Sequence, residues 1–166
     1  MIEIDGLIMR SLQLRDLDTL TEIWSDPKVT RFLPSRGNII LRDKVKESLQ
    51  SFVKHWEERG YGIWAIMPID SPKTIGYCGL RYLDELEEVE IVYGLARAYW
   101  GRQIITKAAS ASVSFGFEVA KLEKIVAMVL PENHASVRRI EKLGFSYQKQ
   151  IEIFNLNVMY YSLSYW

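Results

Sequence analysis

The segment Tyr93–Thr106 has the composition of a site that binds an anion through its backbone. An apolar strand pattern ends at Leu95, a short stretch containing Gly101 follows, and a helical pattern begins at Ile104. The first turn of a helix has unpaired N–H groups and the positive end of the helix dipole, which together bind phosphate. The guanidinium of Arg102 is suited to add a charge-assisted contact. The alternative interpretation is a tight turn that uses glycine only for its backbone freedom.

The rest of the chain alternates strand and helix patterns that position this segment. Apolar stretches predict strands at residues 7–12, 62–67, 75–83, 89–95, 124–130, 145–151 and 158–163. Apolar residues at helical spacing predict helices near residues 17–24, 42–58, 104–119 and 134–143. Asn133 is the expected N-cap of the last helix, and Gly60 and Gly144 follow two of the helix ends. We find no repeat and no linker, so the sequence predicts one mixed α/β domain over residues 1–166.

Composition excludes several classes of protein. The 166 residues include 21 Lys and Arg and 21 Asp and Glu, and this balance argues against binding to DNA, which favours basic proteins. No apolar run is long enough to span a membrane, and the acidic N-terminus does not resemble a secretory signal. The single cysteine, Cys78, fits a reducing cytoplasm, where we expect the protein to lie. We see no cluster of metal ligands, so no metal is expected.

Five stretches of the sequence resemble the GCN5-related N-acetyltransferase (GNAT) family. More narrowly, they are similar to the subgroup that includes the ribosomal-protein alanine acetyltransferases. The resemblance covers almost the whole chain, and its order of elements is the one predicted above. The matching stretches are Leu7–Leu12 with Arg15–Asp18, Trp24–Val29, Ile75–Leu80, Tyr93–Thr106, and Pro131–Ser136 with Glu141–Phe145.

The resemblance implies a GNAT-like fold, with a central, mostly antiparallel sheet of six to seven strands flanked by about four helices. It also implies acetyl-CoA as cosubstrate, held mainly by backbone groups. The strand that ends at Leu95 should part from its neighbour and pair with the pantetheine amides, and the following loop should hold the pyrophosphate. The implied cofactor-binding residues are Ile91, Val92, Tyr93, Gly94, Leu95, Trp100, Gly101, Arg102, Gln103, Ile104, Ile105, Thr106 and Asn133.

The loop departs from the family's usual glycine pattern at three positions. Gln103 stands at the second glycine, Ile105 at a small residue and Lys107 at a common glutamate. Gln103 keeps a backbone N–H donor, but its Cβ would crowd a bound phosphate or push the loop outward. This departure motivates an alternative function, a catalytically weak CoA-binding or regulatory module of the same fold.

The resemblance also suggests two catalytic residues. Glu90, on the strand that leads into the loop, is the candidate general base, and Glu88 on the same strand face competes with it. Both also fit a solvated acidic turn, and Glu90 equally fits a role in positioning the substrate. Ser136 is the candidate donor to the departing thiolate, with a polar first-turn position as the alternative interpretation.

We therefore predict an acetyl-CoA-dependent N-acetyltransferase that acts by direct transfer. The acceptor is expected to be a primary amine, either a protein N-terminal α-amine or a small amine such as a polyamine or an amine antibiotic. An α-amine needs less help with deprotonation than a lysine side chain, because a larger fraction of it is free base at neutral pH. The protein is expected to be a monomer or a homodimer. Phe32 is the aromatic residue most expected to line the acceptor pocket.

Overall fold

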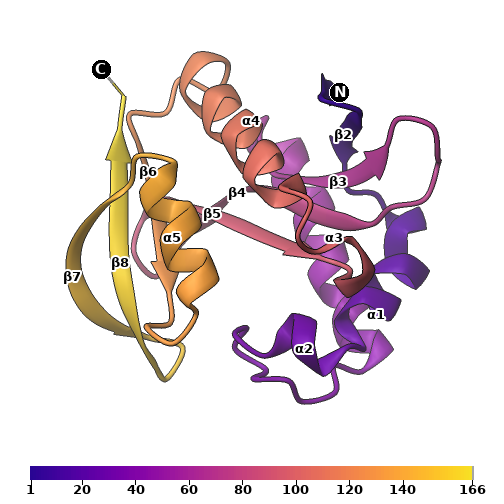
Figure 1. Ribbon diagram of the computed structural model, residues 1–166, viewed down its shortest axis with the longest axis horizontal. Helices are drawn as coiled ribbons and strands as arrows, with labels where there is room; N and C mark the ends of the chain where they lie inside the picture. The colour runs from indigo at the N-terminus through magenta and orange to yellow at the C-terminus, as the bar shows by residue number, and fades with distance from the viewer. Residues whose placement is uncertain (166) are drawn as a thin grey trace.

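The computed structural model describes residues 1–165, and these form one eight-stranded sheet (Figure 1). The order across the sheet is β1-β2-β3-β4-β5-β6-β8-β7. Neighbouring strands are antiparallel except β5 and β6, which are parallel. The strands are β1 (Ile2–Ile4), β2 (Leu7–Ser11), β3 (Ile63–Pro68), β4 (Gly76–Leu83), β5 (Glu88–Leu95), β6 (Lys124–Val129), β7 (Ser146–Ile153) and β8 (Leu156–Ser164).

Helices cover both faces of the sheet. The α-helices are α1 (Leu17–Trp24), α2 (Pro27–Thr30), α3 (Arg42–Arg59), α4 (Ile104–Glu118) and α5 (His134–Lys142), with short 3-10 turns η1 (Leu14–Asp16) and η2 (Arg97–Tyr99). Residues of α4 and α5 share a buried apolar cluster with one face of β3 to β6, and α1 and α3 form a second cluster with the other face of β3 and β4. Within residues 1–165, no helix has the length and apolar character to cross a bilayer.

The mixed α/β class and the mostly antiparallel sheet predicted from the sequence are confirmed. The sheet has one strand more than the six to seven expected, because Ile2–Ile4 pairs with Leu7–Met9. Asp5 and Gly6 make the two-residue turn between them with φ of 45° and 81°, which is a common hairpin geometry for Asp-Gly. The structure has one α-helix more than the four predicted from the sequence. The additional helix is the one-turn helix α2, which begins at Pro27, and its cap is the side chain of Asp26, 3.0 Å from the Lys28 N–H.

The predicted cap of α5 is confirmed, and it fixes the start of a helix that carries a candidate catalytic residue. The side chain of Asn133 accepts a hydrogen bond from the Ser136 N–H at 3.3 Å. Gly60 ends α3 in the left-handed conformation, as the sequence predicts.

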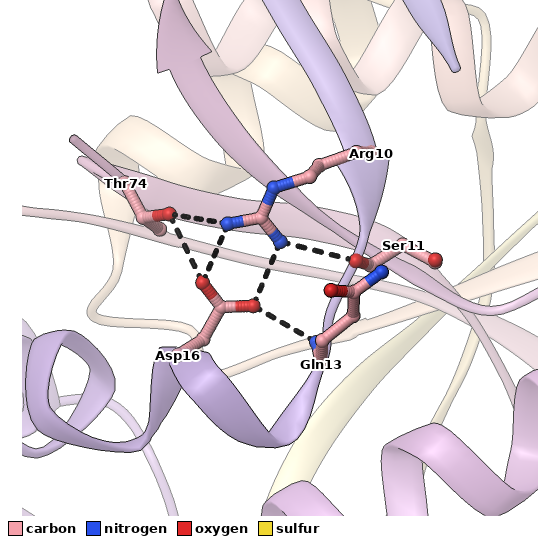
Figure 2. Close-up of polar contacts among 5 residues, drawn as sticks. All are labelled: Arg10, Ser11, Gln13, Asp16 and Thr74. Atoms are coloured by element: carbon pink, nitrogen blue, oxygen red, sulfur yellow. Dashed lines mark hydrogen bonds and ion pairs between the residues drawn. The ribbon is translucent and has the colours of Figure 1, made fainter. Parts of the chain in front are cut away.

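A buried ion pair ties the start of α1 to the sheet (Figure 2). Arg10 of β2 donates two hydrogen bonds to the Asp16 carboxylate, at 2.7 and 2.8 Å, and Asp16 also accepts from the Gln13 N–H and the Thr74 hydroxyl. Burial opposes ionisation of Asp16, but the bonds from Arg10, Gln13 and Thr74 hold its pKa below the usual value. None of the residues that bond to Asp16 lines the cavity described below, so we assign Asp16 a structural role.

Candidate active site

The parallel strands β5 and β6 meet at one point and then part. Glu90 opposite Val126 is the single residue pair recorded between them in the described chain. On its other edge β5 stays paired with β4 along its whole length, and β6 stays paired with β8. The backbone of Ile91–Leu95 therefore has no strand partner on the β6 side, and its polar groups on that edge are free to bind a ligand.

A cavity of about 600 Å³ occupies this opening. Its walls come from the diverging ends of β5 and β6, the starts of α4 and α5, the segment after α2, and the hairpin of β7 and β8. This volume lies within the usual range of pockets that bind small molecules. Figure 1 shows β5 running between the part of the fold that contains α5, β7 and β8 and the part that contains α1 to α3.

Glu90, the predicted base, lines this cavity and is paired with a cation. Its side chain lies directly across from Arg81 on β4, and the Arg81 Nε and a terminal nitrogen both donate to its Oε1. Glu90 is only 6% exposed, and burial raises its pKa above the usual glutamate value although Arg81 acts in the opposite direction. No donor to its Oε2 is recorded among the described residues. A buried carboxylate with a raised pKa and a free oxygen is suited to accept a proton.

Glu88, the competing candidate, lies outside the cavity lining. It pairs with Lys124 at 2.6 Å and accepts a hydrogen bond from the Tyr160 hydroxyl. Partial burial opposes its ionisation, but the bonds from Lys124 and Tyr160 hold its pKa below the usual value. This environment makes Glu88 a weak base and favours Glu90 for that role.

Ser136, the predicted donor to a leaving thiolate, lines the same cavity from the first turn of α5. Its hydroxyl is buried and lies 2.5 Å from the hydroxyl of Tyr93 on β5. The Arg139 guanidinium lies over the Tyr93 ring, 5.1 Å from its centre. Burial raises the pKa of Tyr93, against the opposing effects of Ser136 and Arg139, so the phenol stays protonated and able to donate.

Glu90 and Tyr93 differ by three positions and so project from opposite faces of β5. Glu90 bonds to β4 on the face that carries α1 and α3, whereas Tyr93 bonds to α5 on the other face. Both line one cavity because the strand beside β5 has moved away there. The parting of β5 and β6 thus brings a buried carboxylate and a pair of bonded hydroxyls to the same space from two sides of the sheet.

The loop between β5 and α4 is held to the strand end by Trp100. Its indole N–H donates to the Leu95 carbonyl at 2.8 Å, although the ring is 46% exposed. This hydrogen bond fixes the loop to the end of β5. Arg102 projects over the Tyr99 ring and is not among the residues that line the cavity.

Gln103 precedes α4 as its N-cap, with φ of 62°. Gly101, two residues earlier, has φ of 80°. The left-handed conformation at both positions turns the chain sharply into α4 and leaves the first-turn N–H groups of this helix beside the cavity. Glutamine therefore occupies a backbone conformation that favours glycine, which matches the glycine expected at this position from the family pattern.

The cavity gathers most of the residues that the sequence singles out. Of the candidate site residues, all but Arg102 line it, namely Glu90, Ile91, Val92, Tyr93, Gly94, Leu95, Trp100, Gly101, Gln103, Ile104, Ile105, Thr106, Asn133 and Ser136. Phe32 lines it too, as expected. Sequence reasoning missed Arg81, the side-chain partnership of Tyr93, and the hairpin residues around Phe154. Arg139 also lines the cavity.

Residues 6–146 match the sequence profile of the Acetyltransferase (GNAT) domain, which covers most of the chain. The uncharacterized N-acetyltransferase p20 of Bacillus licheniformis is 30% identical over 145 residues, which are 85% of this chain and 79% of that protein. The chain therefore belongs to the GNAT family of acetyltransferases. It is an N-acetyltransferase that depends on acetyl-CoA.

Solved structures of several acetyltransferases share the fold. The ribosomal-protein-S5-alanine acetyltransferase of Vibrio fischeri superposes with a TM-score of 0.81 at 17% identity, over 98% of this chain and 95% of that chain. A spermidine N-acetyltransferase from Vibrio cholerae, solved with CoA and spermine, gives a TM-score of 0.77 at 18% identity, over 96% and 95%. Both identities are low, so these structures establish the fold and leave the acceptor open.

The residues present fit acetyl-CoA. The free edge of Ile91–Leu95 offers backbone partners for the amides of the pantetheine arm, and the turn at Gly101 and Gln103 aims the N-terminus of α4 at the cavity. The side chain of Asn133 is engaged as a helix cap, and the residue still borders the cavity.

Proposed function

We propose that this protein transfers the acetyl group of acetyl-CoA directly to a primary amine, either a protein N-terminal α-amine or a small amine. The observation that carries the proposal is that Glu90 and Ser136 line one cavity at the point where β5 and β6 part. The ribosomal-protein type of acceptor rests on the resemblance of the sequence and on the fold shared with the Vibrio fischeri enzyme.

Acetyl-CoA supplies the acetyl group as a thioester, and CoA departs as a thiolate that takes a proton from solvent. In the proposed mechanism Glu90 accepts the proton that the amine nitrogen loses as its bond to the acetyl carbon forms, directly or through a water molecule. The raised pKa of Glu90 supports this role, because a base works best when its pKa approaches the working pH.

On the other side of the opening, the Ser136 hydroxyl donates to the sulfur as the carbon–sulfur bond breaks and the electron pair leaves with sulfur. Tyr93 acts on Ser136 rather than on the substrate, because its own hydroxyl is engaged with the Ser136 hydroxyl. We assign Tyr93 as a positioning residue that holds the Ser136 proton toward the cavity.

The proposal is tested with the purified chain, acetyl-CoA and a panel of amines, by following release of the CoA thiol. Acetyl-CoA at one hundred times its Kd should stabilise the fold by about 2.7 kcal/mol. For a chain of this length that is a rise in Tm of roughly 5–10 °C. Thiol release that depends on the amine supports transfer. A thermal shift without thiol release on any amine supports the alternative, a CoA-binding module without turnover.

A further inference from the structure

The charges that surround the cavity restrict which amine it accepts. Among the described residues that line it, Glu90 is the one carboxylate, and Oε1 of that group already accepts from Arg81. Three cationic side chains, those of Lys28, Arg81 and Arg139, line the same cavity. Arg139 lies over the Tyr93 ring, on the side proposed for the thiol of the cosubstrate. The lining that is left for the acceptor, with Glu90 ionised, therefore carries two cations, Lys28 and Arg81, and one anion, a net charge of about +1.

An acceptor with several ammonium groups is poorly matched to this lining. The free Oε2 of Glu90 suits the nitrogen that reacts, but a second ammonium would meet cations or apolar walls. An unpaired charge that leaves water costs several kcal/mol in proteins. The nearby Arg81 charge also favours the neutral form of the reacting amine, which is the form that attacks.

The rest of the acceptor end is apolar. Phe32, from the segment after α2, packs against a buried cluster on β6 and β8 that contains Leu130, Leu156 and Val158. These residues all line the cavity. They form a wall suited to an aliphatic or aromatic group rather than to a polar chain.

Phe154 adds an aromatic ring at the rim of this wall. It sits in the two-residue turn between β7 and β8, where Ile153 pairs with Leu156, and it lines the cavity while 47% exposed. Its φ of 53° is a conformation that bulky side chains rarely adopt. Glycine or asparagine would fit this turn with less strain, so the ring is kept there at a cost to the backbone.

From these observations we infer that the acceptor is an apolar monoamine, a primary amine whose reacting nitrogen is its only cation and whose neighbouring group is aliphatic or aromatic. This inference rests on the proposed function. It narrows the class of acceptor by excluding polyamines and aminoglycosides, which carry several ammonium groups. A small alkylamine and a peptide with an apolar first residue present the same chemistry.

The sharpest test compares pentylamine with cadaverine, because the two differ only by a second ammonium group and their primary amines are similarly basic. We expect kcat/KM of the wild-type protein for pentylamine to exceed that for cadaverine by about tenfold or more. Equal or better use of cadaverine or spermidine overturns the inference and leaves acetyl transfer standing. No thiol release on any amine refutes the proposed function, and the inference with it. Comparing pentylamine with a peptide that begins with leucine then shows whether a small alkylamine or a protein N-terminus is the better acceptor.

Two variants test the parts of the inference separately. Lys28→Glu, at an exposed position at the start of α2, should lower the preference for pentylamine severalfold, whereas Lys46→Glu makes the same charge change on α3 away from the cavity and should keep the wild-type ratio. Phe154→Asn should fold at least as well as the wild type and raise KM for pentylamine. A charge preference that is the same in both lysine variants, together with an unchanged KM in Phe154→Asn, contradicts the inference.

Discussion

Replacing Glu90 by glutamine separates the chemical role of this residue from its contribution to the fold. Glutamine keeps the shape of the side chain and removes the base, so kcat at neutral pH should fall by about a hundredfold or more. That loss corresponds to roughly 2.7 kcal/mol in the barrier, since each tenfold change is about 1.36 kcal/mol. KM for acetyl-CoA should change little, because the proposed binding groups are the backbone of Ile91–Leu95 and the loop after it, which the substitution leaves in place.

The stability of the Glu90→Gln variant should stay constant or rise at neutral pH. Burial raises the pKa of Glu90 more than the Arg81 ion pair lowers it, so the fold disfavours the charged carboxylate. A neutral amide escapes this cost and can still accept a hydrogen bond from Arg81. The substitution should therefore lower activity without lowering stability.

The stability and the activity of the wild type should change in opposite directions as the pH rises. A carboxyl group whose pKa is raised on folding favours the folded state at pH values below its unfolded pKa, and this contribution is lost as the pH rises through the folded pKa. The stability of the wild type relative to Glu90→Gln should thus fall as the pH rises through the window just above the usual glutamate pKa. Over the same window kcat/KM of the wild type should rise, because the base becomes ionised.

The assay is urea unfolding and thiol release on the same preparations across pH, with Glu88→Gln as the matched control. Glu88 lies two residues away on the same strand, carries the same group and lies outside the cavity lining. The control should keep turnover within about twofold and lose about 1 kcal/mol, because its ion pair with Lys124 is only partly buried. Near-wild-type turnover of Glu90→Gln, or a turnover loss as large in Glu88→Gln, would refute the assignment of the base.

Four further predictions concern the other parts of the site and the fold. Ser136→Ala and Tyr93→Phe should lower kcat far more than they raise KM for acetyl-CoA, and the double variant should lose less than the product of the two single losses, because the hydroxyls act through one hydrogen bond. Gly101→Val should weaken acetyl-CoA binding in calorimetry while the chain still folds: a Cβ at this position meets nothing within 4 Å, and the obstacle is the φ of 80°. Gln103→Gly should leave acetyl-CoA affinity unchanged and stability within about 1 kcal/mol, because relief of the left-handed strain is offset by a freer unfolded chain. Asp16→Asn should cost about 3 kcal/mol in urea unfolding at neutral pH, and the difference from wild type should shrink as the pH falls through the lowered pKa of Asp16.

The parts of the site that the sequence predicted well are those encoded locally. The end of β5, the turn at Gly101, the start of α4 and the Asn133 cap each depend on residues within a few positions of one another. Local turn and cap chemistry is strong enough to be recognised in a short stretch of sequence. The resemblance of these same stretches to one family then supplied the ligand.

The parts that the sequence did not predict depend on strand register and on distant packing. Arg81 faces Glu90 because of the exact pairing of β4 with β5, and a shift of one residue would have turned it to the other face of the sheet. Tyr93 and Ser136 are separated by 43 positions, and nothing local links them. The conformation of Gln103 was missed for a related reason: its side chain disfavours the left-handed region, and the surrounding fold imposes it.

The same reasoning explains why the shared fold does not name the acceptor. The backbone that parts at β5 and β6 is independent of side-chain identity, so the cosubstrate site is available to any chain that folds this way. The acceptor end proposed here is lined by side chains from α2, from Arg81 and from the tip of the β7–β8 hairpin. The sheet topology brings these elements together but does not specify their side chains. A relative that replaces Phe154 or Lys28 by acidic residues would keep the chemistry of Glu90 and Ser136 and change the charge its acceptor must carry. Under the acceptor preference inferred above, the charge balance of these few lining residues sets which amine this protein uses.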